Sequence, residues 1–301
     1  MTKSRKRKNE MAAARKRMKG NSPYKWDVFG NDLEKNIDII EDRFIMENTN
    51  LMENTNLSEL IVIGVGMRGK NLAEQIGKEC AWVSCFSFQD EKEIANWSEK
   101  HLSEKILAVI VSCMDVANEE TAVARLVKDA KTNAAFAIAV LGARGNNYAE
   151  IAENSEAVII CPKDHNNSEE SQYKKMYAAA LGLALANAPE AEVSLDVLDI
   201  AAILHGECQF GVEINQNASV AVKQAMKGLF GRNCLLYFYV PKGVSLYDVN
   251  EAAAKVQESL GEDANIIFGI MKKREKRGRI LAFLPDKPVE KIIQVMAYTS
   301  E

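Results

Sequence analysis

The sequence has little of what marks secreted, membrane-spanning or metal-binding proteins. Its 301 residues include three histidines and six cysteines, and no two cysteines form a CxxC pair. Its apolar runs all fall short of the ~18 residues that span a bilayer, and the N-terminus lacks the apolar segment of a secretory signal. We therefore expect a cytoplasmic globular protein with free thiols, no metal site and no transmembrane segment.

Charge is distributed unevenly along the chain. Residues 1–20 hold nine lysines and arginines against one glutamate, a net charge of +8, which leaves −12 on residues 21–301. No aromatic residue is interleaved with these basic residues, so base stacking is not indicated. The segment is either a solvated tail or an arm that binds a polyanion or an anionic surface.

From Leu60 onward, apolar strand-like segments alternate with helical ones. Strands are predicted at 60–65, 81–88, 106–113, 134–141 and 157–161, with helices near 69–79, 91–100, 118–131 and from 147. This alternation predicts an α/β fold with a Rossmann-like parallel sheet that is covered on both faces. The strongly apolar segment 172–187 predicts a long buried helix after the last of these strands.

The pattern changes after Asp199 to α+β. Late strands at 265–273 and 279–285, separated by the basic turn KREKRG, predict a hairpin in a mixed sheet. We predict three parts, which are a basic extension over 1–57, a nucleotide-binding-type domain with the long helix over 58–190, and a second domain over 191–301. The extension contains a short duplication, MENTNL, with no apolar periodicity.

Residues 61–78, IVIGVGMRGKNLAEQIGK, combine an apolar strand, a glycine-rich turn and the start of a helix. Such a turn can hold a phosphate against backbone N–H groups at a helix N-terminus. Gly64, Gly66 and Gly69 match GxGxxG, and Asp90 follows at the distance of the ribose-binding acid in dinucleotide-binding proteins. Taken alone, the motif leaves open a dinucleotide site and a turn whose glycines serve packing.

Longer stretches of the chain resemble FtsZ, the bacterial relative of tubulin. EAAAKVQESLGEDANIIFGIMKKREKRGRILAFLP resembles its C-terminal domain, VSLDVLDIAAIL the stretch after its central helix, and residues 61–78 its first phosphate loop. The resemblance runs in order from about Leu60 to Pro285. It implies a tubulin/FtsZ-like fold, with a GTPase-type domain, a long central helix and an α+β C-terminal domain.

The resemblance also implies where GTP or GDP would bind. Met67 and Arg68 replace glycines of the family's loop, and Arg68 could pair with a phosphate or fill the pocket. The phosphate-binding positions of this degenerate loop are Gly64, Gly66, Arg68, Gly69 and Asn71.

A second phosphate loop of the family, GGGTGTG, corresponds here to MDVANEETA, which has no glycine. It carries the carboxylates Asp115, Glu119 and Glu120. Each carboxylate ~4 Å from a phosphate oxygen costs about 4 kcal/mol at an effective dielectric constant near 20, so two of them offset a micromolar affinity of about 8 kcal/mol. Glu170 and Lys174 fall where the family recognises guanine, so we expect the GTPase to be lost.

Asp196 and Asp199 match two aspartates that, in FtsZ filaments, enter the nucleotide site of the next subunit and position the attacking water. The resemblance implies that they act in trans, with the chain bound head-to-tail to an FtsZ-type subunit or to itself. The same side chains could simply cap the helix that follows. Two other functions stay open, a GTP-binding filament protein and an NAD(P)-dependent oxidoreductase that uses residues 64–69.

Overall fold

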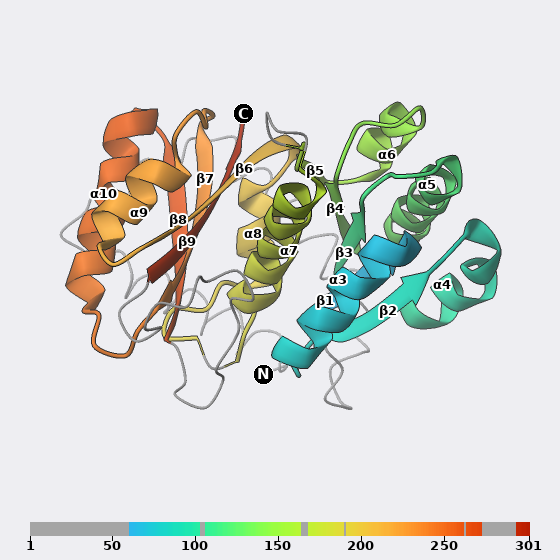
Figure 1. Cartoon of the computed structure of the whole chain (residues 1–301), viewed down its shortest axis with the longest axis horizontal. Coiled ribbons are helices and arrows are strands. Elements are labelled where there is room, and N and C mark those ends of the chain that lie inside the picture. Colours follow the sequence, from blue (N-terminus) through green and yellow to red (C-terminus); the bar gives the residue numbers. More distant parts are fainter. Residues whose placement is uncertain (1–59, 103–105, 164–167, 190, 262, 273–292) are drawn as a thin grey trace, which may run out of the picture. The chain divides into compact units, whose positions relative to one another are not determined.

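The computed structural model describes residues 60–102, 106–163, 168–189, 191–261, 263–272 and 293–301 (Figure 1). The strands are β1 (Leu60–Val65), β2 (Ser84–Phe88), β3 (Leu107–Ser112), β4 (Phe136–Leu141), β5 (Ala157–Ile160), β6 (Gly206–Asn215), β7 (Asn233–Val240), β8 (Asn265–Lys272) and β9 (Ile293–Ser300). The helices are α3 (Gly66–Glu79), α4 (Ala95–Leu102), α5 (Ala117–Thr132), α6 (Tyr148–Asn154), α7 (Glu169–Ala186), α8 (Val197–Ile203), α9 (Ala218–Ala225) and α10 (Leu246–Leu260), with a 3-10 turn at Glu91–Glu93.

The nine strands form one mixed sheet in the order β2-β1-β3-β4-β5-β6-β9-β7-β8. The strands from β2 to β6 pair in parallel, and β7 pairs in parallel with β8. Only β9 is antiparallel, and it lies between β6 and β7. The carboxyl ends of β1, β3 and β4 therefore meet at one edge of the sheet, which is where α/β proteins bind ligands.

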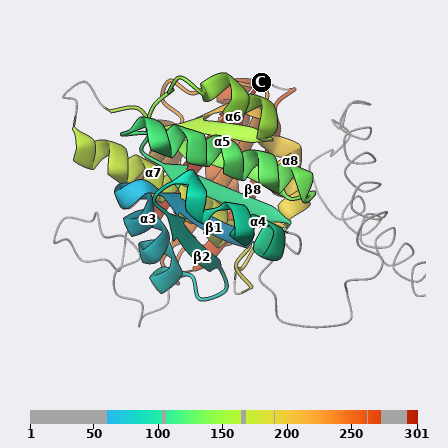
Figure 2. The same cartoon turned by 90° about the vertical axis from the view of Figure 1, so that its right-hand side faces the viewer.

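Helices cover both faces of the parallel strands because the side chains of each strand alternate between the faces. Ile61, Ile63 and Ile110 pack with α5, whereas Val62 and Val109 pack with α3 and α7. Figure 2 shows α3 and α4 on opposite sides of β1 and β2. The expected parallel α/β arrangement is confirmed.

The strands that follow α8 are covered in the same way. Leu236 and Phe238 of β7 pack with α9 and α10, whereas the alternate residues Leu235 and Tyr237 face α7. The side chain of Tyr237 donates a hydrogen bond to the carbonyl of Leu185 at 2.6 Å. The antiparallel β9 makes this part of the sheet mixed, as the sequence predicts.

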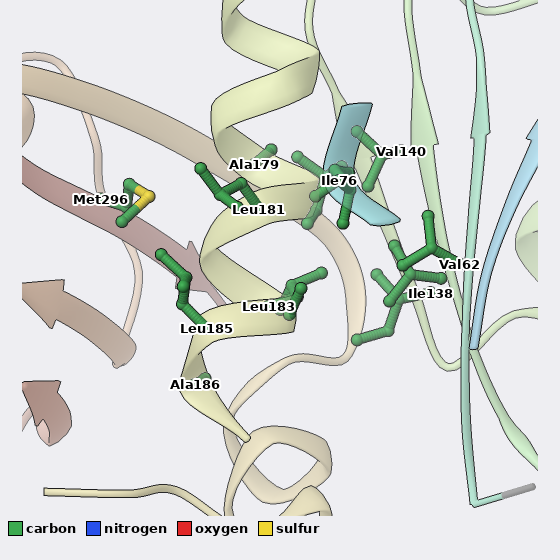
Figure 3. Packing of buried hydrophobic residues seen from close by; sticks show 14 of the residues in the cluster. Val62, Ile76, Ile138, Val140, Ala179, Leu181, Leu183, Leu185, Ala186 and Met296 are labelled. Carbon is green, nitrogen blue, oxygen red and sulfur yellow. The ribbon is translucent and has the colours of Figure 1, made fainter. Parts of the chain in front are cut away.

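Helix α7 is the central element of the fold, and twelve of its eighteen residues are buried. In Figure 3, Met296 of β9 lies on one side of this helix and Val62, Ile138 and Val140 lie on the other. Its apolar residues therefore serve two parts of the sheet at once, which explains why the segment is apolar all round rather than amphipathic.

Several sequence predictions differ from the described structure or lie outside it. The strand β9 is not predicted from the sequence, whereas the predicted strand 279–285 and its hairpin turn lie outside the described residues, as does the extension over 1–57. The described residues from Leu60 onward belong to one compact unit, within which the boundary near residue 190 stays a prediction. In the described part of the chain, no helix has the length and apolar character needed to cross a membrane.

Candidate functional site

The glycine turn, residues 64–69, connects β1 directly to α3. A side chain on Gly64 would place its Cβ 2.1 Å from the carbonyl oxygen of Gly69, and one on Gly69 would lie 2.5 Å from that of Val111. Both distances are far below a van der Waals contact. Two of the three motif glycines are therefore required by the close packing of β1, α3 and β3, with or without a ligand.

Gly66 is different, because its φ of +73° is a conformation that favours glycine. A Cβ at this residue would lie 2.0 Å from the Oε1 atom of Glu119. The Glu119 carboxylate thus lies directly against the α-carbon of Gly66, at the start of α3. A phosphate bound by a turn of this kind occupies such a position, beside the helix N-terminus.

The β3–α5 loop, residues 113–116, holds the other side of this carboxylate. Glu119 is 6% exposed, and its Oε2 atom accepts hydrogen bonds of 3.0 Å from both the Ser112 hydroxyl and the Asp115 N–H. The Ser112 hydroxyl in turn accepts the N–H of Met114 at 3.1 Å. The N–H groups of Met114 and Asp115 are therefore bonded by one buried acidic side chain and its hydroxyl partner.

The neighbouring Glu120 fastens a second loop in the same manner. Its buried Oε2 atom accepts the N–H groups of Asn146 and Asn147 at 2.7 and 3.2 Å, in the connection between β4 and α6. The carboxylate also lies against Gly145, where a Cβ would meet it at 2.3 Å. Two adjacent glutamates in the first turn of α5 thus hold two loops at the carboxyl edge of the sheet.

Arg68 links the glycine turn to the β3–α5 loop and to the start of α7. Its guanidinium donates to Asp115 at 3.2 Å and to the carbonyl of Glu169 at 3.0 Å, and it contacts the Oε1 atom of Gln172 at 3.4 Å. The buried Gln172 donates in turn to the carbonyl of Gly142 at 2.6 Å. These contacts all lie inside the chain, and both interpretations of Arg68, a partner for phosphate or a side chain that fills the pocket, stay predictions.

The structure separates three carboxylates that the sequence prediction treated alike. The prediction had Asp115, Glu119 and Glu120 all face an incoming phosphate, whereas in the structure only Glu119 of the three lies against the glycine turn. In the structure Asp115 pairs with Arg68, and the two glutamates accept hydrogen bonds from the loops. The sequence does not show this, because the direction of a carboxylate in the first turn of a helix depends on the path of the loops around it, which for Glu120 includes the distant connection between β4 and α6.

The other sequence candidates at this end of the sheet have ordinary roles. Glu170 and Lys174 form an exposed ion pair one turn apart on α7. Asp90 caps the 3-10 turn by accepting the N–H of Lys92 at 2.9 Å. Asn71 is exposed on α3.

Cys113, at the end of β3, is not a candidate nucleophile. Burial raises the pKa of its thiol to about 12, so the reactive thiolate is scarce at neutral pH. All six cysteines are free thiols. Among the residues that the structure describes, no group of three or more His, Cys, Asp or Glu side chains could hold a metal ion.

Asp196 and Asp199 lie at the opposite end of α7. The side chain of Asp196 accepts the N–H of Asp199 at 2.8 Å, and that of Asp199 accepts the N–H of Asp196 at 3.2 Å, which forms a capping box for α8. Partial desolvation of its carboxyl group by neighbouring atoms, and then the charge of Asp196, raise the pKa of Asp199. Both residues are exposed, and the cap leaves other lone pairs of their carboxylates available.

Residues that the sequence analysis missed include Ser112 and Gln172. Both are buried polar side chains at the ends of strongly apolar segments, and this contrast was the available signal. Two exposed apolar residues were also missed. Met67 and Val116 are 63% and 56% exposed. Met67 immediately precedes Arg68 in the sequence and Val116 immediately follows Asp115, the ion-pair partner of Arg68.

No family model and no curated protein matches this sequence. Solved structures do match, and they include an empty FtsZ dimer from M. jannaschii, with a TM-score of 0.66 and 14% identity over 86% of this chain and 91% of that one. A point mutant of FtsZ from the same organism gives a TM-score of 0.67 and 14% identity, over 87% and 95% of the two chains. The chain therefore has the tubulin/FtsZ-like fold, as the resemblance in sequence implies.

Proposed function

We propose that this chain is a tubulin/FtsZ-like pseudo-GTPase of the cytoskeleton or of cell division. It acts by binding an FtsZ-type subunit or a second copy of itself, rather than by hydrolysing GTP. The observation that carries the proposal is the Glu119 carboxylate, which lies against Gly66 and accepts hydrogen bonds from the Ser112 hydroxyl and the Asp115 N–H.

The magnitudes support a lost nucleotide site. A phosphate that approached the glycine turn would lie within a few ångströms of the Glu119 carboxylate, at a cost of about 4 kcal/mol per charge pair at 4 Å and an effective dielectric constant near 20. Displacing Glu119 instead would leave buried donors unpaired, at about 1–3 kcal/mol. Either cost removes much of the roughly 8 kcal/mol of a micromolar affinity.

Binding is supported by exposed apolar side chains at both ends of α7. Met67 and Val116 lie at the end that carries the glycine turn. Leu246 and Tyr247, 51% and 74% exposed, begin α10.

The second pair lies at the Asp196 end. Helix α10 starts shortly after Val240, the last residue of β7, which is paired with Lys272 of β8. Lys272 forms an ion pair with Glu192 at 3.1 Å, in the segment between α7 and α8, so the start of α10 lies near the end of α7. The 18-residue α7 is ~27 Å long, so the two pairs of exposed apolar side chains lie at well-separated places. Such surfaces suit a head-to-tail contact, in which unlike surfaces of two subunits meet.

Titration of the purified chain with fluorescent GTP and with NAD tests the proposal, together with an assay of GTP turnover. We expect no saturable binding of either nucleotide and no turnover above background. GTP turnover comparable to that of an FtsZ would contradict the proposal and favour a working filament protein. Tight NAD binding would contradict it in favour of an oxidoreductase.

The partner is tested by mixing the chain with an FtsZ from the same cell. We expect a change in the GTP hydrolysis or the filament length of that FtsZ, or self-association of this chain in sedimentation. If hydrolysis and filament length stay unchanged at equimolar ratio and the chain sediments as a monomer, the binding role is wrong.

A further inference from the structure

The β3–α5 loop keeps the shape of an anion-binding loop although it contains no glycine. Met114 has φ +59°, a conformation that is uncommon for any residue other than glycine, asparagine or aspartate. The N–H groups of Met114 and Asp115 both point to the Ser112–Glu119 pair. Consecutive N–H groups in such a turn form a concave site for an anion.

The anion that this loop holds is part of the chain. Glu119 lies in the first turn of the 16-residue α5, where the helix dipole favours a negative charge. Its two oxygens face different elements, since Oε1 lies against Gly66 of α3 and Oε2 accepts the Asp115 N–H of the loop and the Ser112 hydroxyl of β3. The carboxylate therefore bridges the glycine turn and the β3–α5 loop, as a bound phosphoryl group would.

We propose that Glu119 is a built-in substitute for an anionic ligand, which fixes the β3–α5 loop without a ligand and excludes phosphate from the glycine turn. The inference rests on the proposed function, because the group that Glu119 replaces is then a phosphoryl group of a nucleotide. A strained residue such as Met114 persists only where its surroundings hold it. Here the Ser112 hydroxyl accepts the Met114 N–H, and Glu119 in turn accepts that hydroxyl and the N–H of the next residue, Asp115.

The proposal predicts that removing Glu119 exposes an anion site. The variant Glu119→Ala leaves the Asp115 N–H and the Ser112 hydroxyl without their acceptor and opens the space beside Gly66. Its Tm should fall by about 5 °C, since buried donors lose their partner. Inorganic phosphate or pyrophosphate should then restore part of the loss at constant ionic strength, because the binding groups are still in place.

Glu119→Gln separates charge from shape. The glutamine side chain has nearly the same size, so it still fills the space beside Gly66 and still offers one acceptor oxygen. We expect a smaller fall in Tm for this variant and no restoration by phosphate. Glu156→Ala is the matched control, because Glu156 accepts the N–H of Ala137 at 2.8 Å at another place in the fold. This control should lose stability without a response to phosphate.

Calorimetric titration with pyrophosphate gives the second measurement. Glu119→Ala should bind pyrophosphate at least about tenfold more tightly than the wild-type chain does, because a negative charge a few ångströms from the bound anion has been removed. If Glu119→Ala is insoluble in chloride, refolding in phosphate buffer should recover it, and failure in both buffers would overturn the proposal.

Equal pyrophosphate affinity in Glu119→Ala and wild type would also overturn it, as would equal restoration by phosphate in Glu119→Ala and Glu156→Ala. The two proposals fail separately. GTP turnover by the wild-type chain contradicts the proposed function, whereas a Glu119→Ala variant that ignores phosphate contradicts only the role of Glu119.

Discussion

The charged side chains at the two ends of α7 differ in burial and in the partners that they bond. At the start of the helix, Arg68 donates to the Asp115 side chain, and the buried Glu119 accepts the Asp115 N–H. At its end, Asp196 and Asp199 are exposed and cap only the short α8. One end is closed by contacts within the chain, while the other still presents carboxylates to solvent.

Under the proposed function, this difference shows how a nucleotide site is lost while its fold is kept. The glycines at 64 and 69 are explained by backbone packing, so they stay necessary whether or not a phosphate binds. The change that the proposal invokes lies in side chains on α3 and α5. The following predictions test the contrast between the two ends, from the largest expected effect to the smallest.

The largest effect should follow from Gly64→Ala. Its Cβ would lie 2.1 Å from the carbonyl oxygen of Gly69, so β1 and α3 must separate. We expect a loss of more than ~3 kcal/mol in the free energy of unfolding, measured in urea. Gly243→Ala is the matched control, because no atom lies within 4 Å of a Cβ there. If Gly64→Ala is as stable as this control, the packing explanation of the motif is wrong.

A smaller effect is expected for Arg68→Ala, which removes a link between α3, the β3–α5 loop and α7. The ion pair is partly exposed, so we expect a loss of about 1–2 kcal/mol, measured by denaturant unfolding. Lys70→Ala, which breaks the exposed pair with Glu74 one turn along α3, should cost about 0.5 kcal/mol or less. Equal losses in the two variants would show that Arg68 does not hold the site closed.

At the other end of α7, the double change Asp196→Ala, Asp199→Ala should remove any stimulation of GTP hydrolysis in an FtsZ-type partner. Loss of the Asp196 cap should cost about 1 kcal/mol, so the variant should stay folded in circular dichroism. Ser245→Ala is a control, because Ser245 forms the same kind of capping box for α10. If the folded double variant alters the partner as the wild type does, the aspartates are caps alone.

The smallest effect on stability is expected from deleting residues 1–20. This segment contains few apolar residues, so its removal should leave the Tm of the chain unchanged. If it binds polyanions, as we propose for its net charge of +8, the deletion should flatten the salt dependence of that binding. A large fall in Tm would show instead that the segment packs on the rest of the chain.

Much of the fold was predictable because its signals are local. The apolar segment after Tyr173 gave the buried α7, and the strand-turn-helix pattern around Gly66 gave β1 and α3. The strand β9 was not predicted, because its position depends on pairing with β6 and β7, whose residues are distant in the sequence.

The location of the candidate site was predictable from the sequence, whereas the orientation of its side chains was not. Parallel strands bring the loops after β1 and β3 to one edge, which the alternation of strands and helices already indicates. Whether Glu119 points out of that edge or into it depends on a hydrogen bond from Asp115 and on the missing side chain of Gly66. Such contacts are set by atoms, and residue types alone do not reveal them.

The position of β9 also determines when this protein can finish folding. During synthesis, β6 and β7 emerge from the ribosome well before β9, although β9 fills the space between them. Roughly 60 residues separate Val240 from Ser300, which takes about 3–12 s to translate at 5–20 residues per second. For that interval, the facing edges of β6 and of the strongly apolar β7 lack their partner, and unpaired strand edges of this kind are prone to aggregation in a nascent chain.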